Sequence, residues 1–271
     1  MAPYILNSKG ICERKKWRRL SGFTLIELIT VVVILSLIAT IGTSFVVRTT
    51  ETYQRTQTRA LILNTSRQAL ERITRQLRIA LPFSVRITNS GSCVEFMPIA
   101  AGGNYFDPVS DNTNMGPDRS TIPASPVPVP ADFGTPVFVT IGAMDSTEIY
   151  GAGAVSREGY AGYAGGNLTL AAARRWQRNS LNRRYYLLDN PQAFCVVGNE
   201  LRFYSGININ DANVTVTAAH NIIARNVSAT TPFTLVAGNN NRNTALDITL
   251  VFAASGESMS YTQRVLIRNV P

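Results

Sequence analysis

The distribution of apolar residues divides the chain into one long helical segment and a longer region of strand-like pattern. Residues 28–47 form a run of twenty residues without a charge, and as a helix they would span about 30 Å, the hydrocarbon thickness of a bilayer. No proline occurs between Phe23 and Leu81, and Pro82 follows directly. Because proline cannot continue a helix, we expect one continuous helix that ends before Pro82.

The part of this helix beyond the apolar run is amphipathic. Apolar residues recur there at three- and seven-residue steps, namely Leu63, Leu70, Ile73, Leu77 and Ala80. We therefore assign residues 23–47 to a transmembrane helix and residues 48–81 to an amphipathic helix whose apolar stripe packs on a sheet. Gly42 and Ser44 leave open whether the helix is kinked or straight.

Residues 82–271 are predicted to form a β-rich globular head large enough for one domain. Strands are expected at residues 84–88, 93–97, 136–141, 185–188, 194–197, 201–204, 214–217, 246–253 and 259–270. Gly198 and Asn199 separate two of these stretches and predict a hairpin turn. The expected fold class is α+β, with the long N-terminal helix packed on an antiparallel head.

Two insertions interrupt the strand pattern. Residues 98–135 contain seven prolines and are expected to form a long ordered loop or a polyproline stretch. Residues 151–166 are rich in Gly, Ala and Tyr and are expected to form a flexible surface segment. These segments either contact partner proteins or have no binding role, and the sequence leaves both interpretations open.

Positive charge is concentrated ahead of the apolar run. Residues 1–22 carry six basic residues against one acid, and this bias favours a cytoplasmic N-terminus. The small pair Ser21-Gly22 comes before the apolar core, whereas a secretory signal peptide has its small residues after it. A cut after Gly22 would therefore leave the membrane segment on the mature chain.

Glu27 is the carboxylate at the edge of the apolar run. A charge costs about 2.5–3.5 kcal/mol at the centre of a bilayer, so Glu27 requires a compensating partner. Cleavage before Phe23 would create an α-amine, which is a cation at neutral pH. The amine of a neighbouring, staggered helix can reach Glu27, and deleting one member of such a buried pair costs about 3–5 kcal/mol.

The stretch SGFTLIELITVVVILSLIATIG, residues 21–42, resembles the class III leader junction of type IV prepilins and type II secretion pseudopilins. The resemblance implies that residues 1–22 are a leader peptide, that a prepilin peptidase/methyltransferase cuts between Gly22 and Phe23, and that Phe23 becomes N-methylated. It assigns Glu27 to filament assembly. The partners implied are this peptidase, the inner-membrane assembly platform, and other major and minor pilin subunits contacted through the N-terminal helix.

The helix-to-head junction at residues 67–78 resembles that of J-type pseudopilins and W-type minor pilins, and the whole-chain pattern is most similar to minor pilins of the MshO type from the mannose-sensitive haemagglutinin (MSHA) pilus. This implies a non-enzymatic subunit of the pilin fold that waits in the inner membrane, with its N-terminus cytoplasmic and its head periplasmic, before joining a filament. Initiating or capping the filament are open roles. The alternatives are a type II secretion pseudopilin and, from another class, a tip adhesin or DNA-binding module.

Cysteine usage agrees with export. Cys12 would leave with the leader, and Cys93 and Cys195 remain as an even pair in an oxidising compartment. A bridge between them would close a loop of about 100 residues and contribute up to about 4–5 kcal/mol on the chain-entropy model. Two separate buried thiols are the alternative.

No catalytic constellation is found in the sequence, and we expect neither a cofactor nor a metal site. His220 is the only histidine and is expected to be a loop residue. One loop gathers oxygen-bearing side chains that would suit calcium, although their spacing departs from an EF-hand. These are Asp107, Asp111, Asn112, Asn114 and Asp118.

A basic and aromatic cluster is the remaining candidate for binding, because such side chains stack on single-stranded nucleic acid. It comprises Arg174, Arg175, Trp176, Arg178, Arg183, Arg184, Tyr185 and Tyr186. A solvated turn or a subunit contact is the competing interpretation. Residues 82–271 balance 13 Arg against 13 acids, and this neutrality argues against nucleic acid as the main partner.

Overall fold

The computed structural model describes residues 22–126, 134–229, 231–236 and 243–267. Residues 1–21, which include Cys12 and most of the expected leader, lie outside the described residues, as do residues 127–133 and the end of the last expected strand at 268–270. The chain divides into two compact units, residues 1–54 and residues 55–271. Each is described by itself below.

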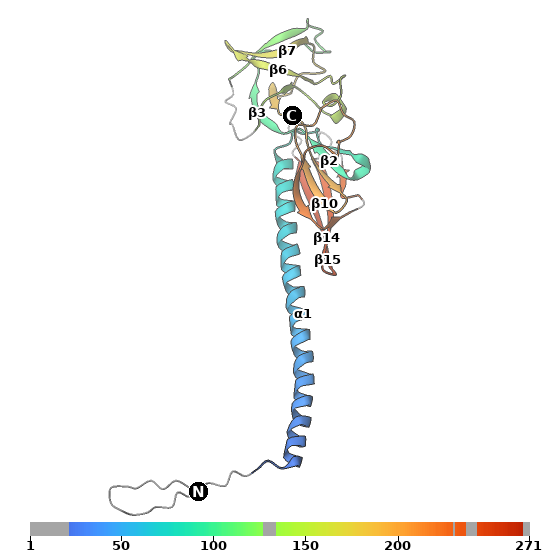
Figure 1. Ribbon diagram of the computed structural model, residues 1–271. Helices are drawn as coiled ribbons and strands as arrows, with labels where there is room; N and C mark the ends of the chain where they lie inside the picture. The colour runs from blue at the N-terminus through green and yellow to red at the C-terminus, as the bar shows by residue number, and fades with distance from the viewer. Residues whose placement is uncertain (1–21, 127–133, 230, 237–242, 268–271) are drawn as a thin grey trace, which may run out of the picture. The chain divides into compact units, whose positions relative to one another are not determined.

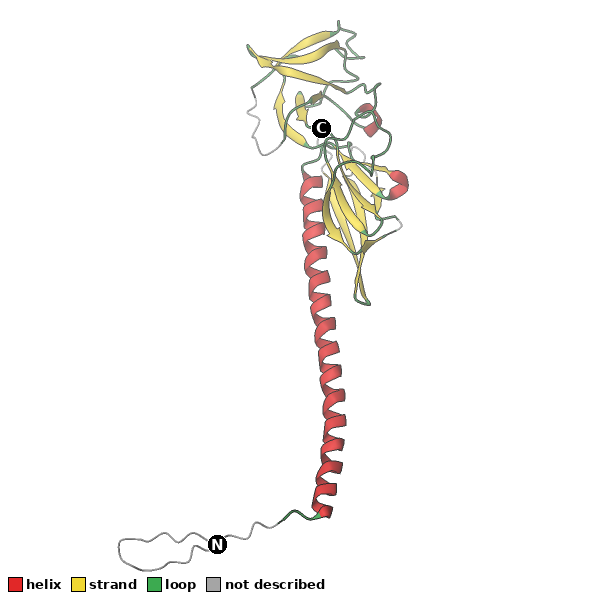
Figure 2. Ribbon diagram, viewed as in Figure 1, coloured by secondary structure: helices red, strands yellow, loops and turns green. Residues whose placement is uncertain are grey.

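Helix α1 spans Leu25–Arg78 and supplies all the regular structure described in the first unit (Figure 2). It is long and apolar enough to cross a membrane, and it continues without a break through Gly42. Hydroxyl side chains inside the apolar run donate to carbonyls three or four residues earlier, which removes unpaired donors from an apolar setting. They are Thr30, Ser36, Thr40, Thr43 and Ser44.

In the second unit, one face of α1 is buried against the head. Leu70, Ile73, Leu77 and Ala80 are buried as the periodicity predicts, and Leu63 is half-buried. The helix ends at Arg78, a few residues ahead of Pro82. The chain then leaves the helix and contacts the start of β3. Ile99 N donates to the Ile79 carbonyl at 3.1 Å, and Ala80 forms an antiparallel β-bridge with Pro98.

Two antiparallel sheets form the part of the head that packs on α1. The first has the order β1-β2-β9-β10-β11, and the second has β14 paired with β12 and β13 along one edge and with β15 along the other. The strands of the first sheet are β1 Arg86–Thr88, β2 Cys93–Phe96, β9 Gln192–Val197, β10 Glu200–Tyr204 and β11 Asn221–Arg225. Those of the second are β12 Val227–Ser228, β13 Phe233–Val236, β14 Thr244–Ala254 and β15 Glu257–Ile267.

The main hydrophobic core lies between these sheets and α1. Ile73 and Leu77 of the helix are fully buried among apolar side chains of both sheets, including Phe96, Phe194 and Phe252. Phe194 packs between two other rings, with centroids 6.1 Å from Phe96 and 5.1 Å from Phe203. The apolar stripe of the second half of α1 therefore packs on sheet, as predicted.

Residues 97–191 form a lobe inserted between two neighbouring strands of the first sheet. β2 and β9 pair directly, with Phe96 opposite Gln192, so the lobe leaves and rejoins the sheet at one place. It carries a third sheet in the order β3-β8-β5-β6-β7-β4 (Figure 1). Its strands are β3 Ile99–Asn104, β4 Arg119–Pro123, β5 Phe138–Thr140, β6 Arg157–Ala164, β7 Asn167–Arg174 and β8 Arg184–Leu188.

The sheet of the lobe curls until its two edge strands meet. Tyr105, directly after β3, bridges Ala124, directly after β4, and Phe106 N donates to the Pro123 carbonyl at 2.9 Å. The enclosed side chains form a separate core around Trp176, Tyr105 and Tyr185. The lobe thus hides both edges of its sheet near this closure and buries aromatic side chains inside it.

The predictions of a loop at residues 98–135 and of a flexible segment at residues 151–166 were therefore wrong in part. β3 and β4 lie in the first stretch, and all of β6 lies in the second. Glycine and proline in these stretches concealed strands that pairing and burial stabilise. Residues 214–217, expected as a strand, form a loop. The hairpin turn at Gly198 and Asn199 is confirmed, since Val197 pairs with Glu200.

A buried polar cluster joins the lobe to the sheet that packs on α1. Arg86 bonds Glu95 through two nitrogens at 3.1 Å, donates to the Asp211 carbonyl at 2.7 Å, and stacks 3.8 Å from the ring centroid of Tyr150 in the lobe. Glu95 is completely buried, and this burial raises its pKa although Arg86 opposes the shift. Removing Arg86 would leave an unpaired buried carboxyl group.

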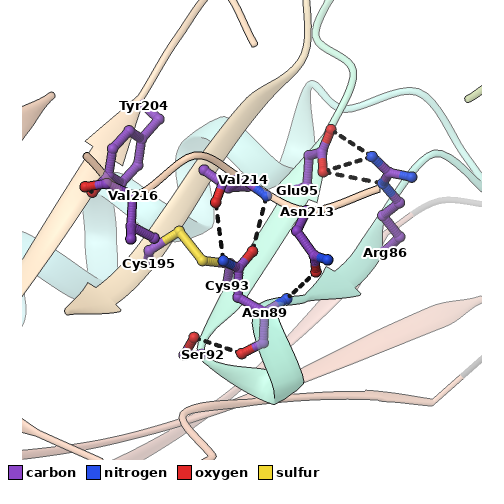
Figure 3. The surroundings of a disulfide bond; sticks show 10 residues. All are labelled: Arg86, Asn89, Ser92, Cys93, Glu95, Cys195, Tyr204, Asn213, Val214 and Val216. Atoms are coloured by element: carbon purple, nitrogen blue, oxygen red, sulfur yellow. Dashed lines mark hydrogen bonds and ion pairs between the residues drawn. A yellow bond between two sulfur atoms is a disulfide. The ribbon is translucent and has the colours of Figure 1, made fainter. Parts of the chain in front are cut away.

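A disulfide closes the base of the inserted lobe (Figure 3). Cys93 on β2 and Cys195 on β9 are directly opposite in register, fully buried, and joined through their sulfurs at 2.08 Å. Asn89 fastens the nearby loop over this bond by bonding Asn213 and both backbone groups of Val214, each at 2.9 Å. The cross-link therefore holds the two strands from which the lobe departs.

Replacing Cys93 and Cys195 together by alanine should lower the free energy of unfolding by about 2–5 kcal/mol, because the bond closes a loop with a sequence separation of 102. Urea unfolding of the full chain in detergent, followed by circular dichroism, measures the loss. Dithiothreitol should destabilise the parent chain and leave the double variant unchanged. A variant as stable as the oxidised parent contradicts the prediction.

Ile73→Ala should lower the free energy of unfolding by about 2–5 kcal/mol, because it empties space in the core between α1 and the sheets. The same urea titration measures it. Leu61→Ala is the matched control on the same helix, since Leu61 is 64% exposed, and its shift should stay within about 0.5 kcal/mol. Equal losses at the two positions would contradict the packing of this helix face.

Candidate functional site

The candidate site is the junction where the chain enters α1. Gly22, Phe23 and Thr24 have no helical structure, and the helix begins at Leu25. The peptide bond between Gly22 and Phe23 therefore lies outside the helix, where its carbonyl and N–H are not held by helical hydrogen bonds. No described atom lies within 4 Å of a Cβ built on Gly22, so the glycine borders open space.

Thr24 caps the helix, a role that the sequence analysis missed. Its hydroxyl accepts a hydrogen bond from Glu27 N at 3.4 Å, and its carbonyl accepts from Leu28 N at 3.2 Å. The spacing Thr24-Leu25-Ile26-Glu27 fits a capping box, and this pattern would have located the helix start. The cap places the first turn of α1 directly after the candidate cleavage bond.

Glu27 lies in that first turn, where the free N–H groups of the helix favour a carboxylate. It is exposed and forms no ion pair or side-chain hydrogen bond with another described residue. The apolar side chains that follow are exposed as well, from Leu28 at 61% to Val47 at 50%. The segment thus presents one unpaired carboxylate beside an uncovered apolar surface.

The basic and aromatic cluster is largely occupied by contacts inside the lobe. Arg178 bonds both carboxylate oxygens of Glu148 at 2.7 Å, and Arg174 bonds Glu158 at 3.4 Å and stacks near Trp176. Burial alone would raise the pKa of Glu148, but the bonds from Arg178, Met144 and Ser156 lower it. Tyr185 and Trp176 are buried.

The remaining arginines of this cluster are also engaged or dispersed. Arg175 lies 3.6 Å from Asp118, and Arg183 donates to the Phe106 carbonyl. Arg184 is half-buried on β8. The aromatic rings and arginines thus stabilise the lobe and do not form an open stacking surface.

The oxygen-rich loop at Asp107–Asp118 is held by the protein's own hydrogen bonds. Asp111 accepts from the backbone of Thr113 and Asn114 with one oxygen, and from the backbone and side chain of Asn179 with the other. Burial would raise the pKa of Asp111, but these bonds outweigh it and lower the pKa. Among the described residues, no group of three or more His, Cys, Asp or Glu side chains is placed to hold a metal ion.

The disulfide cysteines and His220 are the other two candidates, and both have contacts within the head. Cys93 and Cys195 lie in the core beside Tyr204, remote in sequence from the helix junction. His220 follows a turn, with Nδ1 2.9 Å from the Ala218 carbonyl and its ring 5.4 Å from that of Tyr204. Among the candidates that the sequence indicated, the junction around Phe23 and Glu27 is therefore the described region whose charge and apolar surface have no partner within the described residues.

Residues 17–43 match the prokaryotic N-terminal methylation motif. The match covers residues 17–24 ahead of the helix and the apolar start of α1, and it includes the candidate site around Phe23 and Glu27. Neither a search of curated proteins nor a search of solved structures finds a match to the chain. The motif, together with the long apolar helix that follows it, supports a subunit of the type IV pilin or pseudopilin class.

Proposed function

We propose that this chain is a minor pilin of a type IV pilus, of the MSHA type, and that it acts as a non-enzymatic filament subunit. A prepilin peptidase removes residues 1–22 and methylates Phe23. The observation that carries the proposal is the methylation motif at residues 17–43 on a helix whose apolar face is uncovered. The assignment to the MSHA type rests on three features that together resemble minor pilins of the MshO type: the large head, the junction at residues 67–78, and the C-terminal sequence Val-Leu-Ile-Arg-Asn-Val-Pro at residues 265–271.

The apolar surface of the helix determines how the subunit is stored in the membrane and how it enters a filament. Before assembly, residues 23–47 are covered by inner-membrane lipid, with the leader in the cytoplasm and the head in the periplasm. During assembly, the apolar helices of other subunits replace the lipid around Leu28 to Val47. Glu27 accepts the α-amine of a neighbouring subunit, and this pairing sets the stagger between helices because a shifted helix would leave the carboxylate alone.

The proposal is tested by shearing filaments from cells that carry the complete pilus system and analysing the subunits by mass spectrometry. The expected result is this chain beginning with N-methylated Phe23 in the filament fraction. Its recovery only in the inner membrane, with residues 1–22 attached while the major pilin is processed, would overturn the proposal.

Gly22→Asp should block cleavage, because a charged side chain replaces the smallest residue next to the cut bond. Amine labelling measures this directly. All three lysines, Lys9, Lys15 and Lys16, precede the cut, so the processed chain has its α-amine as the only primary or secondary amine. The variant should keep the lysine labels, whereas loss of all three would contradict the assigned cleavage position.

Glu27→Ala should be cleaved and retained in the membrane but should fall at least ten-fold in sheared filaments, because the partner's amine loses its counter-charge. Quantitative immunoblotting of membrane and filament fractions measures the ratio. Glu51→Ala is the control, since Glu51 is an exposed helix carboxylate beyond the apolar run. Normal filament content of the Glu27 variant rules out the pairing.

A further inference from the structure

The outer edge of strand β15 pairs with no other strand that the structure describes. β15 pairs with β14 over eleven consecutive residue pairs without a register shift, and the two-residue turn Ser255-Gly256 joins them. In such a hairpin, alternate residues counted from Glu257 bond to β14, and the residues between them point their N–H and C=O groups the other way. These outward-bonding residues are Ser258, Ser260, Thr262, Arg264 and Leu266, and no other described strand pairs with them.

This edge lacks the features that usually protect an edge strand. It has no proline and no bulge among its described residues, and its one charged outward residue, Arg264, is neutralised by two bonds to Asp247 at 2.6 and 2.7 Å. Leu266 on the same edge is 58% exposed. A long, flat, unprotected edge is a template on which another strand can pair.

Helix α1 lies beside β15 and runs in the same direction. Arg59 bonds Glu257 at 2.9 Å where β15 begins, and further along both elements Gln263 faces the helix turn around Leu70 and Thr74. From Arg59 to Leu70 the helix rises about 16 Å, and from Glu257 to Gln263 the strand rises about 20 Å. The helix and the strand therefore advance by similar distances between these two points of contact. Between them lies a groove of about 540 Å³.

The groove offers positive charge. Its helix side carries Arg67, Glu71, Arg75 and Arg78, of which Arg75 bonds Glu71 at 3.3 Å. Arg67 and Arg78 have no ion-pair partner among the described residues. These two arginines suit carboxylates.

We propose that the free edge of β15 takes up an extended acidic segment of another protein as an added strand, whose carboxylates face the arginine-lined groove. Backbone groups of the segment bond the outward groups of β15, and every second side chain points toward α1. Arg67 and Arg78 are separated by about 16 Å along the helix, and three carboxylates at alternate strand positions span about 14 Å.

The partner differs from this chain because the chain has no segment of the required pattern. Nowhere in the 271 residues do two acids occur two positions apart; the closest are Asp145 and Glu148. A second copy pairing through its own β15 would bring arginines against arginines. The inference does not rest on the proposed function, since it uses only residues of the second unit.

The test uses the full-length chain in detergent and a capped nonapeptide of alternating glutamate and valine with a neutral fluorophore. Fluorescence anisotropy should show saturable binding, and hydrogen exchange should show protection at Ser260, Thr262 and Arg264. Thr262→Pro should weaken binding at least ten-fold, because it removes an outward N–H while sparing the bonds to β14. Thr262→Val is its control and should bind as the parent does.

A second pair of variants tests the charge. Arg67→Gln with Arg78→Gln should weaken binding at least ten-fold, whereas Arg48→Gln with Arg55→Gln, the same change on exposed arginines outside the groove, should not. Each variant is first shown to unfold at the urea concentration of the parent. Equal binding by a peptide of alternating lysine and valine overturns the proposal, as does binding that survives both Thr262→Pro and the arginine changes.

Two further outcomes also decide the question. Absence of saturable binding up to about 1 mM peptide overturns the proposal. Self-association of the chain that Thr262→Pro abolishes would assign the edge to a second copy and equally overturn it.

Discussion

An uncharged, uncovered apolar helix surface with one carboxylate at its edge is the constraint from which the rest of the account follows. Water cannot cover the exposed side chains from Leu28 to Val47 at an acceptable free energy, so lipid or other apolar helices must do so. Glu27 then sits beside a medium that disfavours its charge. A cationic group supplied by another molecule would resolve the conflict, and the proposed cleavage before Phe23 would create such a group on every subunit.

The second unit is built on a different principle, because its charges are mostly satisfied internally. Arg178 with Glu148, Arg86 with Glu95, and Arg264 with Asp247 each use two nitrogen contacts to one carboxylate. The inserted lobe is tied at its base by the disulfide and by the Arg86 cluster. At the surface of the described head, the edge of β15 and the groove beside it offer unpaired backbone groups and unpaired arginines, and this is where we place a partner.

The sequence predicted α1 well because its signals are strong and local: twenty uncharged residues, a seven-residue apolar repeat, and Pro82 as a stop. The capping role of Thr24 was missed, although the spacing of Thr24 and Glu27 fits a capping box. Apolar strands next to a turn signal, such as β9 and β10 around Gly198, were also predictable. Residues 214–217 are β-branched and were expected as a strand, yet Asn89 holds Val214 in a loop through contacts 125 residues apart in sequence.

The lobe was not predictable in the same way. β6 contains Gly159 and Gly162, and this composition led to the expectation of a flexible segment at residues 151–166; only pairing with β5 and β7 makes it a strand. That Arg174 and Arg178 serve the lobe's own carboxylates depends on Glu158 and Glu148, which lie 16 and 30 residues away in sequence. The local sequence indicated a basic cluster, but only the tertiary structure shows that its arginines bond carboxylates inside the lobe.

The most direct test of the central claim is zero-length carbodiimide cross-linking of intact filaments, with the linked peptides identified by mass spectrometry. The proposed cleavage removes all three lysines, so the α-amine at Phe23 would be the one amine of this chain available for amide formation. The account predicts a peptide that joins Glu27 to the N-terminal residue of a neighbouring subunit. Recovery of Glu27 unlinked, while exposed carboxylates such as Glu51 react freely with an added amine, would contradict it.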